Sequence, residues 1–267
     1  MKLSRILGGV AALALMGAAT AQAASLVTNG DFTAHGATAS GITLADGTAQ
    51  LNNSDGYITG WTTGDGSLAT SGYNQVWLFP NGNPDAPQGG GWYGGWPIYG
   101  PASGYNNGFA NIRPGSPIVE LDAGGDYRGS LYQTLNGLTP GATYNVSFDW
   151  GGGQQTCCSG TTTEQLQVSF GGSTQSTIVW HNPQAGFSGW MHESFNFTAD
   201  ATSDVLSFVA VGTPSGYPPV ALLSGVSASA VPEPAAWTMM IVGIGALGAV
   251  ARRRRAMSAF AAETLAA

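Results

Sequence analysis

Aromatic side chains are concentrated in one glycine-rich stretch of the chain, between Trp92 and Phe109. Flat aromatic rings stack on the C–H faces of sugars, and neighbouring amide side chains can hold sugar hydroxyls. The alternative is that these rings pack over one end of the fold and fill the gaps that glycine leaves. The candidate ligand-binding residues in this stretch are Trp92, Tyr93, Trp96, Tyr99, Asn106 and Asn107.

Cys157 and Cys158 are the only cysteines of the chain, and they are adjacent in a loop rich in Gly, Gln and Thr. After export, a pair of free thiols does not persist in an oxidising compartment. Adjacent cysteines can close a vicinal disulfide that stiffens the loop, or they can cross-link two chains. Two sulfur ligands without a neighbouring His or acid do not define a zinc site. The sequence therefore favours an oxidised Cys157–Cys158 pair.

Recognised catalytic motifs are absent from the sequence. The histidines His35, His181 and His192 show no metal-ligand spacing, and neither G-x-S-x-G nor H-E-x-x-H occurs. Glycoside hydrolysis needs only two facing carboxylates, but any acidic domain offers such pairs. We therefore expect no enzyme and no cofactor, and interpret the acidic residues as solvated surface. The carboxylates that a hydrolase would draw on include Glu120, Asp122, Glu164 and Glu193.

Charge is distributed unevenly along the chain. Charged residues make up 9% of the sequence, and six of the eight Lys and Arg lie near its two ends. Between Ala24 and Val231, thirteen acidic residues are accompanied by only two cations, Arg113 and Arg128. A body without a basic patch cannot neutralise a phosphate backbone, so nucleic acid is not an expected partner. Low charge together with 41 glycines is typical of exported β-proteins with long loops.

Alternating hydrophobicity dominates residues 24–230, where no long helical period is present. From Tyr144 to Trp150 every second residue is apolar, as in a half-buried strand. Residues 205–211 are apolar on both faces apart from Ser207, which is typical of a central strand. Short strands separated by turn residues predict an all-β antiparallel sandwich, with 80–117 as long loops. The expected strands are 26–32, 144–150, 165–170, 194–198, 205–211 and 222–226.

Two segments of this body resemble a known family. The N-G-D-F motif at 29–32 is similar to the opening of galactose-binding-like jelly rolls, which include many carbohydrate-binding modules. The segment L-Y-Q-T-L-N-G-L-T-P-G-A-T-Y at 131–144 resembles the Q-T-I-x-G-L-x-P-G-x-x-Y segment of the same proteins. The resemblance implies one antiparallel jelly-roll domain over residues 24–230 and a body that engages carbohydrate.

Some relatives in this family hold a structural calcium ion with carboxylates near the opening motif and in the last strand. In this chain Thr33 and Ser224 stand at two of those positions. Because calcium prefers several oxygen ligands, carboxylates among them, the resemblance leaves Asp31 as a weak calcium candidate and defines no metal site.

The N-terminus, residues 1–23, has the three regions of a secretory signal peptide. Lys2 and Arg5 form the positive region, and residues 6–19 form the apolar region. The alternative is an uncleaved membrane anchor, for which the segment is short. We expect export and removal of the signal peptide. The residues of the small-x-small cleavage site and the mature start are Ala21, Ala23 and Ala24.

An apolar, uncharged segment, residues 235–251, stands near the C-terminus. As a helix with a rise of 1.5 Å per residue it would extend about 25 Å, slightly short of a typical ~30 Å hydrocarbon core. A basic block follows at once and would stay on the cytoplasmic side, so we expect one transmembrane helix. Residues 256–267 form a short tail. The basic block consists of Arg252, Arg253, Arg254 and Arg255.

The residues before this segment keep the backbone extended, because Pro232 and Pro234 flank Glu233 and oppose helix formation. The order Pro-Glu-Pro, Trp237, apolar segment and arginines resembles the PEP-CTERM sorting signal, in its PEPxxWA variant, over residues 231–255. The resemblance implies processing by an exosortase-like membrane protease. A plain C-terminal anchor is the alternative.

These features predict an exported, non-catalytic envelope or matrix protein. The C-terminal helix would hold it in the inner membrane until an exosortase-like protease passes it to the cell surface or the extracellular matrix. Its body would bind surface exopolysaccharide. One alternative is a structural, self-associating matrix protein without a specific ligand. The other is a glycoside hydrolase with an unrecognised pair of carboxylates.

Overall fold

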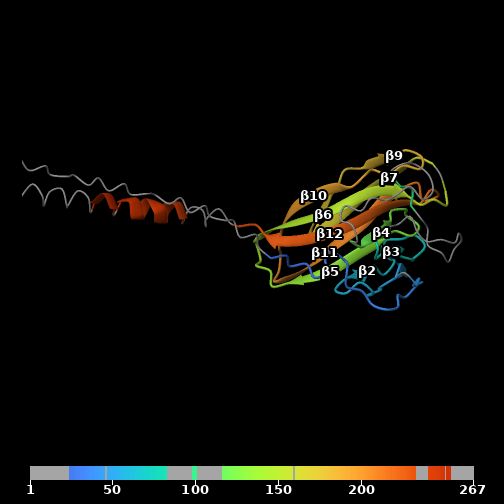
Figure 1. Cartoon of the computed structure of the whole chain (residues 1–267), viewed down its shortest axis with the longest axis horizontal. Coiled ribbons are helices and arrows are strands. Elements are labelled where there is room, and N and C mark those ends of the chain that lie inside the picture. The colour runs from blue at the N-terminus through green and yellow to red at the C-terminus, as the bar shows by residue number, and fades with distance from the viewer. Residues whose placement is uncertain are drawn as a thin grey trace, which may run out of the picture.

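The computed structural model of the chain describes residues 24–45, 47–82, 98–100, 116–158, 160–232, 240–249 and 251–253. In this part of the chain, twelve β-strands form two facing antiparallel sheets (Figure 1). The predicted all-β antiparallel sandwich is therefore confirmed.

The first sheet has the strand order β1-β3-β4-β12-β6-β10, and each neighbouring pair is antiparallel. Its two long strands, β12 and β6, lie side by side, and their register shifts between Ser224 and Ser227. The strands are β1 (Ala49–Leu51), β3 (Val76–Phe79), β4 (Ile118–Asp122), β6 (Thr143–Gln154), β10 (Met191–Thr198) and β12 (Pro219–Ala230).

The second sheet has the order β2-β5-β11-β7-β8, and the short strand β9 also pairs with β7. Its central strand, β11, is the one predicted at 205–211, but only one of its faces is covered. Leu206 and Phe208 are buried, whereas the side chain of Val205 on the other face is 49% exposed. The strands are β2 (Thr62–Thr63), β5 (Ser130–Asn136), β7 (Thr162–Phe170), β8 (Ser173–Ser176), β9 (Trp180–Asn182) and β11 (Ser203–Thr213).

The main hydrophobic core lies between the two sheets. The alternation predicted in β6 is confirmed, since Tyr144, Val146 and Phe148 are buried while Asn145 and Ser147 between them are partly exposed. The rings of Phe148 and Phe208, one from each sheet, meet edge to face with centroids 5.2 Å apart. Such edge-to-face pairs add to the free energy gained by burying the rings.

A second hydrophobic cluster covers part of the outer face of the first sheet. It arises because β3, β4 and β12 carry apolar residues on both faces, as buried strands do. Phe187 and Trp190 pack against it from the loop before β10. The buried members of this cluster are Trp77, Phe79, Ile98, Ile118, Val220 and Leu222.

The predicted opening strand at 26–32 is wrong. Asn29 and Phe32 have φ angles of 52° and 58°, and such left-handed conformations interrupt an extended run. The segment instead runs beside β12, where the Val226 N–H donates to the Gly30 carbonyl at 2.8 Å. A Cβ atom on Gly30 would lie 1.9 Å from the Val226 oxygen. This close approach explains the glycine of the N-G-D-F motif.

The turn at 137–141 forms as predicted from its Pro-Gly pair. Gly137 and Gly141 have φ angles of 76° and 82°, which glycine adopts without steric cost. The Tyr144 hydroxyl accepts a hydrogen bond from the Thr139 N–H at 2.9 Å, and so ties the start of β6 to the turn. The second family-like segment therefore encodes a strand-to-strand connection.

Near the C-terminus, residues 240–249 and 251–253 are helical (red in Figure 1). Within the described ranges, no helix combines the length and the apolar character needed to cross a membrane. The predicted membrane segment, 235–251, begins outside these ranges. Residues 1–23 and 254–267 also lie outside them.

Candidate functional site

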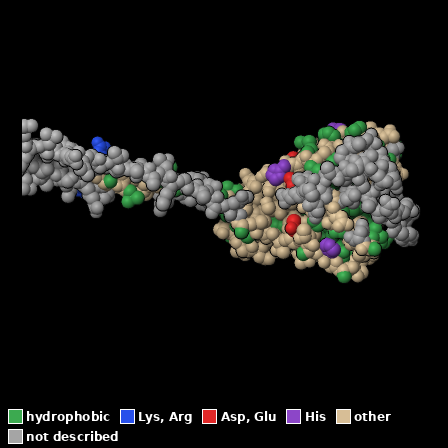
Figure 2. Space-filling model, viewed as in Figure 1, with side chains coloured by type: hydrophobic (Ala, Val, Ile, Leu, Met, Phe, Trp, Pro, Cys, Tyr) green, Lys and Arg blue, Asp and Glu red, His purple; other side chains and the backbone are tan. Residues whose placement is uncertain are grey.

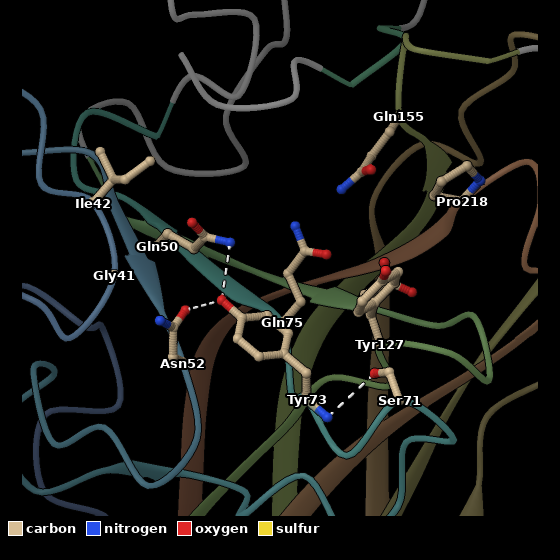
Figure 3. Close-up of a pocket in the computed structure, with 11 residues that line it drawn as sticks. Gly41, Ile42, Gln50, Asn52, Ser71, Tyr73, Gln75, Tyr127, Gln155 and Pro218 are labelled. Atoms are coloured by element: carbon tan, nitrogen blue, oxygen red, sulfur yellow. Dashed lines mark hydrogen bonds between the residues drawn. The ribbon is translucent and has the colours of Figure 1, made fainter. Parts of the chain in front are cut away.

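A cavity of about 720 Å³ opens on the outer face of the first sheet, beside the second hydrophobic cluster (Figure 3). It lies where β3 begins and where β4 and β6 end, so its walls come from segments that are far apart in the sequence. The polar and aromatic residues that line it include Gln50, Asn52, Tyr73, Gln75, Asp122, Tyr127 and Gln155.

Two tyrosines supply the flat surfaces of this cavity. Their rings meet edge to face, with centroids 6.1 Å apart and an interplanar angle of 85°. The Tyr73 hydroxyl is held by β1 and the residue after it, because it donates to Asn52 Oδ1 and accepts from Gln50 Nε2 (Figure 3). Burial, and to a smaller extent Tyr127, raises the pKa of Tyr73. Tyr127 is 45% exposed, so its ring is open to a ligand.

Two glutamine amides face the opening between these walls. Figure 3 shows the side chains of Gln75 and Gln155 both extending into it. Within the described part of the chain, the side-chain amide of Gln75 has no hydrogen-bond partner, while its backbone N–H donates to the Tyr127 carbonyl at 3.0 Å. Gln155 Nε2 donates to Glu120 Oε1 at 2.7 Å, which leaves the Gln155 carbonyl oxygen as an acceptor. The cavity therefore offers free amide donors and acceptors beside aromatic rings, the groups that hold hydroxyl-rich ligands.

The prediction that the acidic residues are solvated surface is wrong for two carboxyl groups of β4, Glu120 and Asp122, which are buried behind the amides because they lie under the cavity and the second hydrophobic cluster. Burial raises the pKa of Asp122 to about 7, although the Gly124 N–H that it accepts at 2.7 Å acts in the opposite direction. Burial raises the pKa of Glu120 to about 8 against the opposing effect of the Gln155 hydrogen bond. Glu120 is only 1% exposed, and its Oε2 atom and the Trp77 Nε1 atom have no partner in the described ranges. Burial therefore favours the neutral form of Glu120 at pH 7.

The adjacent cysteines follow Gln155 at the end of β6. Their sulfur atoms lie 2.6 Å apart and are not bonded to each other in the structure, so the vicinal disulfide stays a prediction. Burial raises the pKa of the Cys157 thiol, and the charges of Cys158 and Asp122 act in the same direction. The pair thus lies close to the carboxyl group that lines the cavity.

The predicted aromatic loop falls mainly outside the described residues, which include none of Trp92, Tyr93, Trp96, Asn106 and Asn107. Tyr99 is described, and its N–H donates to the Gln154 carbonyl at 2.9 Å. Ile98 forms an isolated β-bridge with Gln155. The described part of this loop is therefore anchored beside the cavity.

The sequence did not predict the cavity residues in and after β1, in the segment just before β3, or in the 123–129 loop. A weak signal was present, because Gln50 and Asn52, and likewise Tyr73 and Gln75, are two residues apart and can share one face of a strand. The sequence does not show that these segments lie side by side in the fold.

The weak calcium candidate, Asp31, forms hydrogen bonds within its own turn. Its carboxylate accepts a hydrogen bond from the Thr33 hydroxyl at 3.0 Å. Ser224, the second position considered for calcium, donates its hydroxyl to the Pro117 carbonyl at 3.1 Å. In the part of the chain that the structure describes, no three His, Cys, Asp or Glu side chains are grouped as a metal site requires.

The other acidic candidates lie apart from the cavity. Glu164 on β7 is fully buried, and its Oε2 atom has no partner in the described ranges. Burial raises the pKa of Glu164 to about 8. His192 on β10 contacts Asp149 on β6, with 2.8 Å between Nδ1 and Oδ1. Neither group lines the cavity.

Comparison with known proteins identifies the C-terminal segment. Residues 230–255 match the PEP-CTERM protein-sorting motif, so the predicted sorting signal is confirmed. Its central residues, Glu233 to Trp237, lie outside the described ranges. No curated protein matches the chain in sequence.

Several solved structures resemble the sandwich, among them carbohydrate-binding modules. The structure of TmCBM61 in complex with β-1,4-galactotriose is 16% identical, and the match covers 65% of this chain and 90% of that chain with a TM-score of 0.35. A family 4 module is 15% identical over 56% of this chain and 89% of its own, with a TM-score of 0.26. The CBM22-1 xylan-binding domain of Paenibacillus barcinonensis Xyn10C is 10% identical over 46% and 78%, with a TM-score of 0.29. Such distant likeness says nothing about what this chain binds.

Proposed function

We propose that this chain is an exported, non-catalytic protein whose sandwich binds a surface polysaccharide and whose C-terminal motif directs its sorting. The observation that carries the binding half is the cavity between Tyr73, Tyr127, Gln75 and Gln155. It combines the open ring of Tyr127 with the side-chain amide of Gln75, unpaired within the described ranges, and the side-chain carbonyl oxygen of Gln155. Its volume of about 720 Å³ falls within the range of ligand pockets.

The charges around the cavity favour a neutral part of the polysaccharide. Among the described lining residues there is no Lys or Arg, and the one acid, Asp122, has a raised pKa. On the face of the molecule in Figure 2, Lys and Arg side chains are visible on the C-terminal helical segment but not on the sandwich. Amides and a carboxyl group that is partly protonated at pH 7 bind hydroxyl groups without requiring a charged partner.

Binding fits the geometry of the two carboxyl groups better than hydrolysis does. A glycosidase needs both carboxyl groups in contact with the scissile bond. Glu120 is buried beneath the cavity and holds Gln155, so it positions an amide instead of facing a ligand. Asp122 alone cannot supply the acid and the nucleophile or base.

The sorting half rests on the motif at 230–255. In our proposal, the N-terminal segment is a signal peptide cleaved before Ala24, and residues 235–251 hold the exported protein at the inner membrane. An exosortase-like protease then recognises the Pro-Glu-Pro tripeptide and passes the protein to the cell surface or the matrix. The extended backbone that Pro232 and Pro234 impose suits recognition as a strand.

Affinity electrophoresis tests the binding half. Residues 24–231 contain all twelve strands and both hydrophobic clusters, so we expect this segment to fold alone. Its migration should be slowed in gels that contain the exopolysaccharide of the producing cell, and unaffected in gels with dextran. Equal migration in all gels would favour the structural matrix protein that has no specific ligand.

Replacement of Glu233 tests the sorting half. We expect Glu233→Ala to leave full-length protein in the inner membrane, because the tripeptide loses its only charged group. Glu263→Ala in the C-terminal tail is the matched control and should be processed normally. Immunoblots of membrane and surface fractions distinguish the two forms. Normal trimming of the Glu233 variant would contradict recognition of the tripeptide.

A further inference from the structure

A second cavity, of about 370 Å³, lies on the outer face of the second sheet. Its floor is formed by β5 and β11, where Tyr132 and Ser207 are register partners. One wall is the loop after β2, with Ser67, and the other is Arg128, just before β5. Tyr127 and Arg128 are consecutive, yet they line different cavities.

Arg128 is exceptional among the charges of the body. Residues 24–231 contain only two cations, and Arg128 is the one that the structure describes. Within the described ranges, its guanidinium has no hydrogen-bond or ion-pair partner, and its Nε atom is buried. A buried N–H without an acceptor costs free energy, and a guanidinium readily binds an anion through two parallel hydrogen bonds. The chain has fifteen acidic side chains, yet none of the described ones pairs with this arginine, so Arg128 is available to bind an anionic ligand.

The nearby carboxylates are engaged elsewhere. Asp65 lines the same cavity, but it accepts the Ser67 N–H at 2.8 Å, and this hydrogen bonding lowers its pKa. Asp126, two residues before Arg128, accepts from the Thr70 hydroxyl at 2.7 Å. Neither lies within ion-pair distance of the guanidinium. Because Asp65 stays charged, a ligand must place its anion at Arg128 and its hydroxyl groups toward Asp65.

The remaining lining groups fit a sugar ring. Tyr132 offers an aromatic face, and the Ser207 hydroxyl is partly exposed beside it. An aromatic ring, hydroxyls and one cation match a sugar that bears a carboxylate. We propose that this cavity is a second glycan site that binds an acidic sugar residue, with Arg128 pairing to its carboxylate. This inference rests on the proposed function, because both cavities would bind polysaccharide. The two cavities share no lining residue.

The test measures binding of trigalacturonic acid to the full-length protein in detergent by isothermal titration calorimetry. The fully methyl-esterified trisaccharide is the matched ligand without charge. We expect the acid to bind and the ester to bind at least about tenfold more weakly, because a charge-assisted hydrogen bond is lost. Arg128→Gln should weaken binding of the acid by a similar factor, and Arg128→Lys by less. Arg252→Gln makes the same charge change in the basic block, outside the sandwich, and should not change the affinity for the acid.

Several results would overturn the proposal. They are equal affinity for acid and ester, an Arg128→Gln variant that binds normally, and the absence of any binding to the acid. Sodium sulfate that binds as tightly as the sugar acid would show a general anion site and overturn the sugar assignment. Tyr127→Ala separates the two sites, since it should impair neutral glycan binding and spare the acid. Thermal unfolding of each variant verifies its fold.

Discussion

Tyr127→Ala will weaken binding of the sandwich to its polysaccharide about 10- to 100-fold, the effect of removing a central aromatic contact. The Tyr127 ring is the open face of the tyrosine pair, whereas the Tyr73 hydroxyl is held by Asn52 and Gln50. A sugar ring stacked on Tyr127 would lose its contact area in the Ala variant. Affinity electrophoresis over a series of polysaccharide concentrations gives the dissociation constants.

The controls for this prediction separate stacking from folding. Tyr127→Phe keeps the ring and should bind within about threefold of the unmodified protein, because aromatic area carries the stacking contact. Tyr217→Ala removes a ring of similar exposure, 43% against 45%, from outside the cavity lining, and should leave affinity unchanged. Gln75→Ala should also weaken the affinity for the polysaccharide, because the side-chain amide of Gln75 is free to bind a sugar hydroxyl. Unaltered affinity in both Tyr127→Ala and Gln75→Ala would exclude this cavity as the glycan site.

Glu120→Gln will make the sandwich more stable at pH 8 and reduce the dependence of its stability on pH. Burial raises the pKa of Glu120 from 4.5 to about 8, so the folded chain keeps a proton that the unfolded chain releases. Below pH 4.5 both states hold the proton and stability is unaffected. As the pH rises toward 8, ionisation of Glu120 lowers the free energy of the unfolded state, so the free energy of unfolding falls.

The expected change in the free energy of unfolding follows from the rise in the pKa of Glu120. Each pKa unit corresponds to about 1.4 kcal/mol, so the rise in the pKa of Glu120 from 4.5 to about 8 predicts a loss of about 4 kcal/mol of stability between pH 4.5 and pH 8. Gln has the same shape and does not ionise, and its carbonyl can still accept from Gln155 Nε2. Urea unfolding of residues 24–231 at several pH values measures the change. Glu193→Gln, the same substitution on the partly exposed β10, is the control.

A pH slope in Glu120→Gln equal to that of the unmodified protein would contradict a neutral buried Glu120. Asp122 and Glu164 also have pKa values raised by burial, to about 7 and about 8, so part of the slope should persist in the variant. A loss of stability in the variant that grows as the pH rises would instead mean that ionised Glu120 is stabilised by partners.

Local patterns predicted much of the second half of the sandwich. Alternation from Tyr144 to Trp150 identified the inward face of β6, and the Pro-Gly turn at 137–141 forms as expected. Both features depend on neighbouring residues alone. The sorting motif was equally local, and it was recognised from the order of its tripeptide, apolar segment and arginines.

The first half was harder because its structure depends on partners distant in the sequence. The run at 26–32 has the composition of a strand, but two left-handed residues and the approach of Gly30 to β12 make it an irregular segment. The strands β1 and β2 have three and two residues, too few to show a period. The cavity joins Gln50 to Gln155 across the sheet, and no local pattern contains that pairing.

The most direct test of the proposed glycan site is hydrogen–deuterium exchange of residues 24–231. It is measured with and without the polysaccharide that slows the migration of this segment in affinity electrophoresis. Binding in the first cavity predicts slower exchange in the segments that form its walls. Those segments are 71–75, 125–129 and 154–156. Slower exchange confined to other surfaces, with these three segments unchanged, would contradict the proposal that the tyrosine and glutamine cavity binds the glycan.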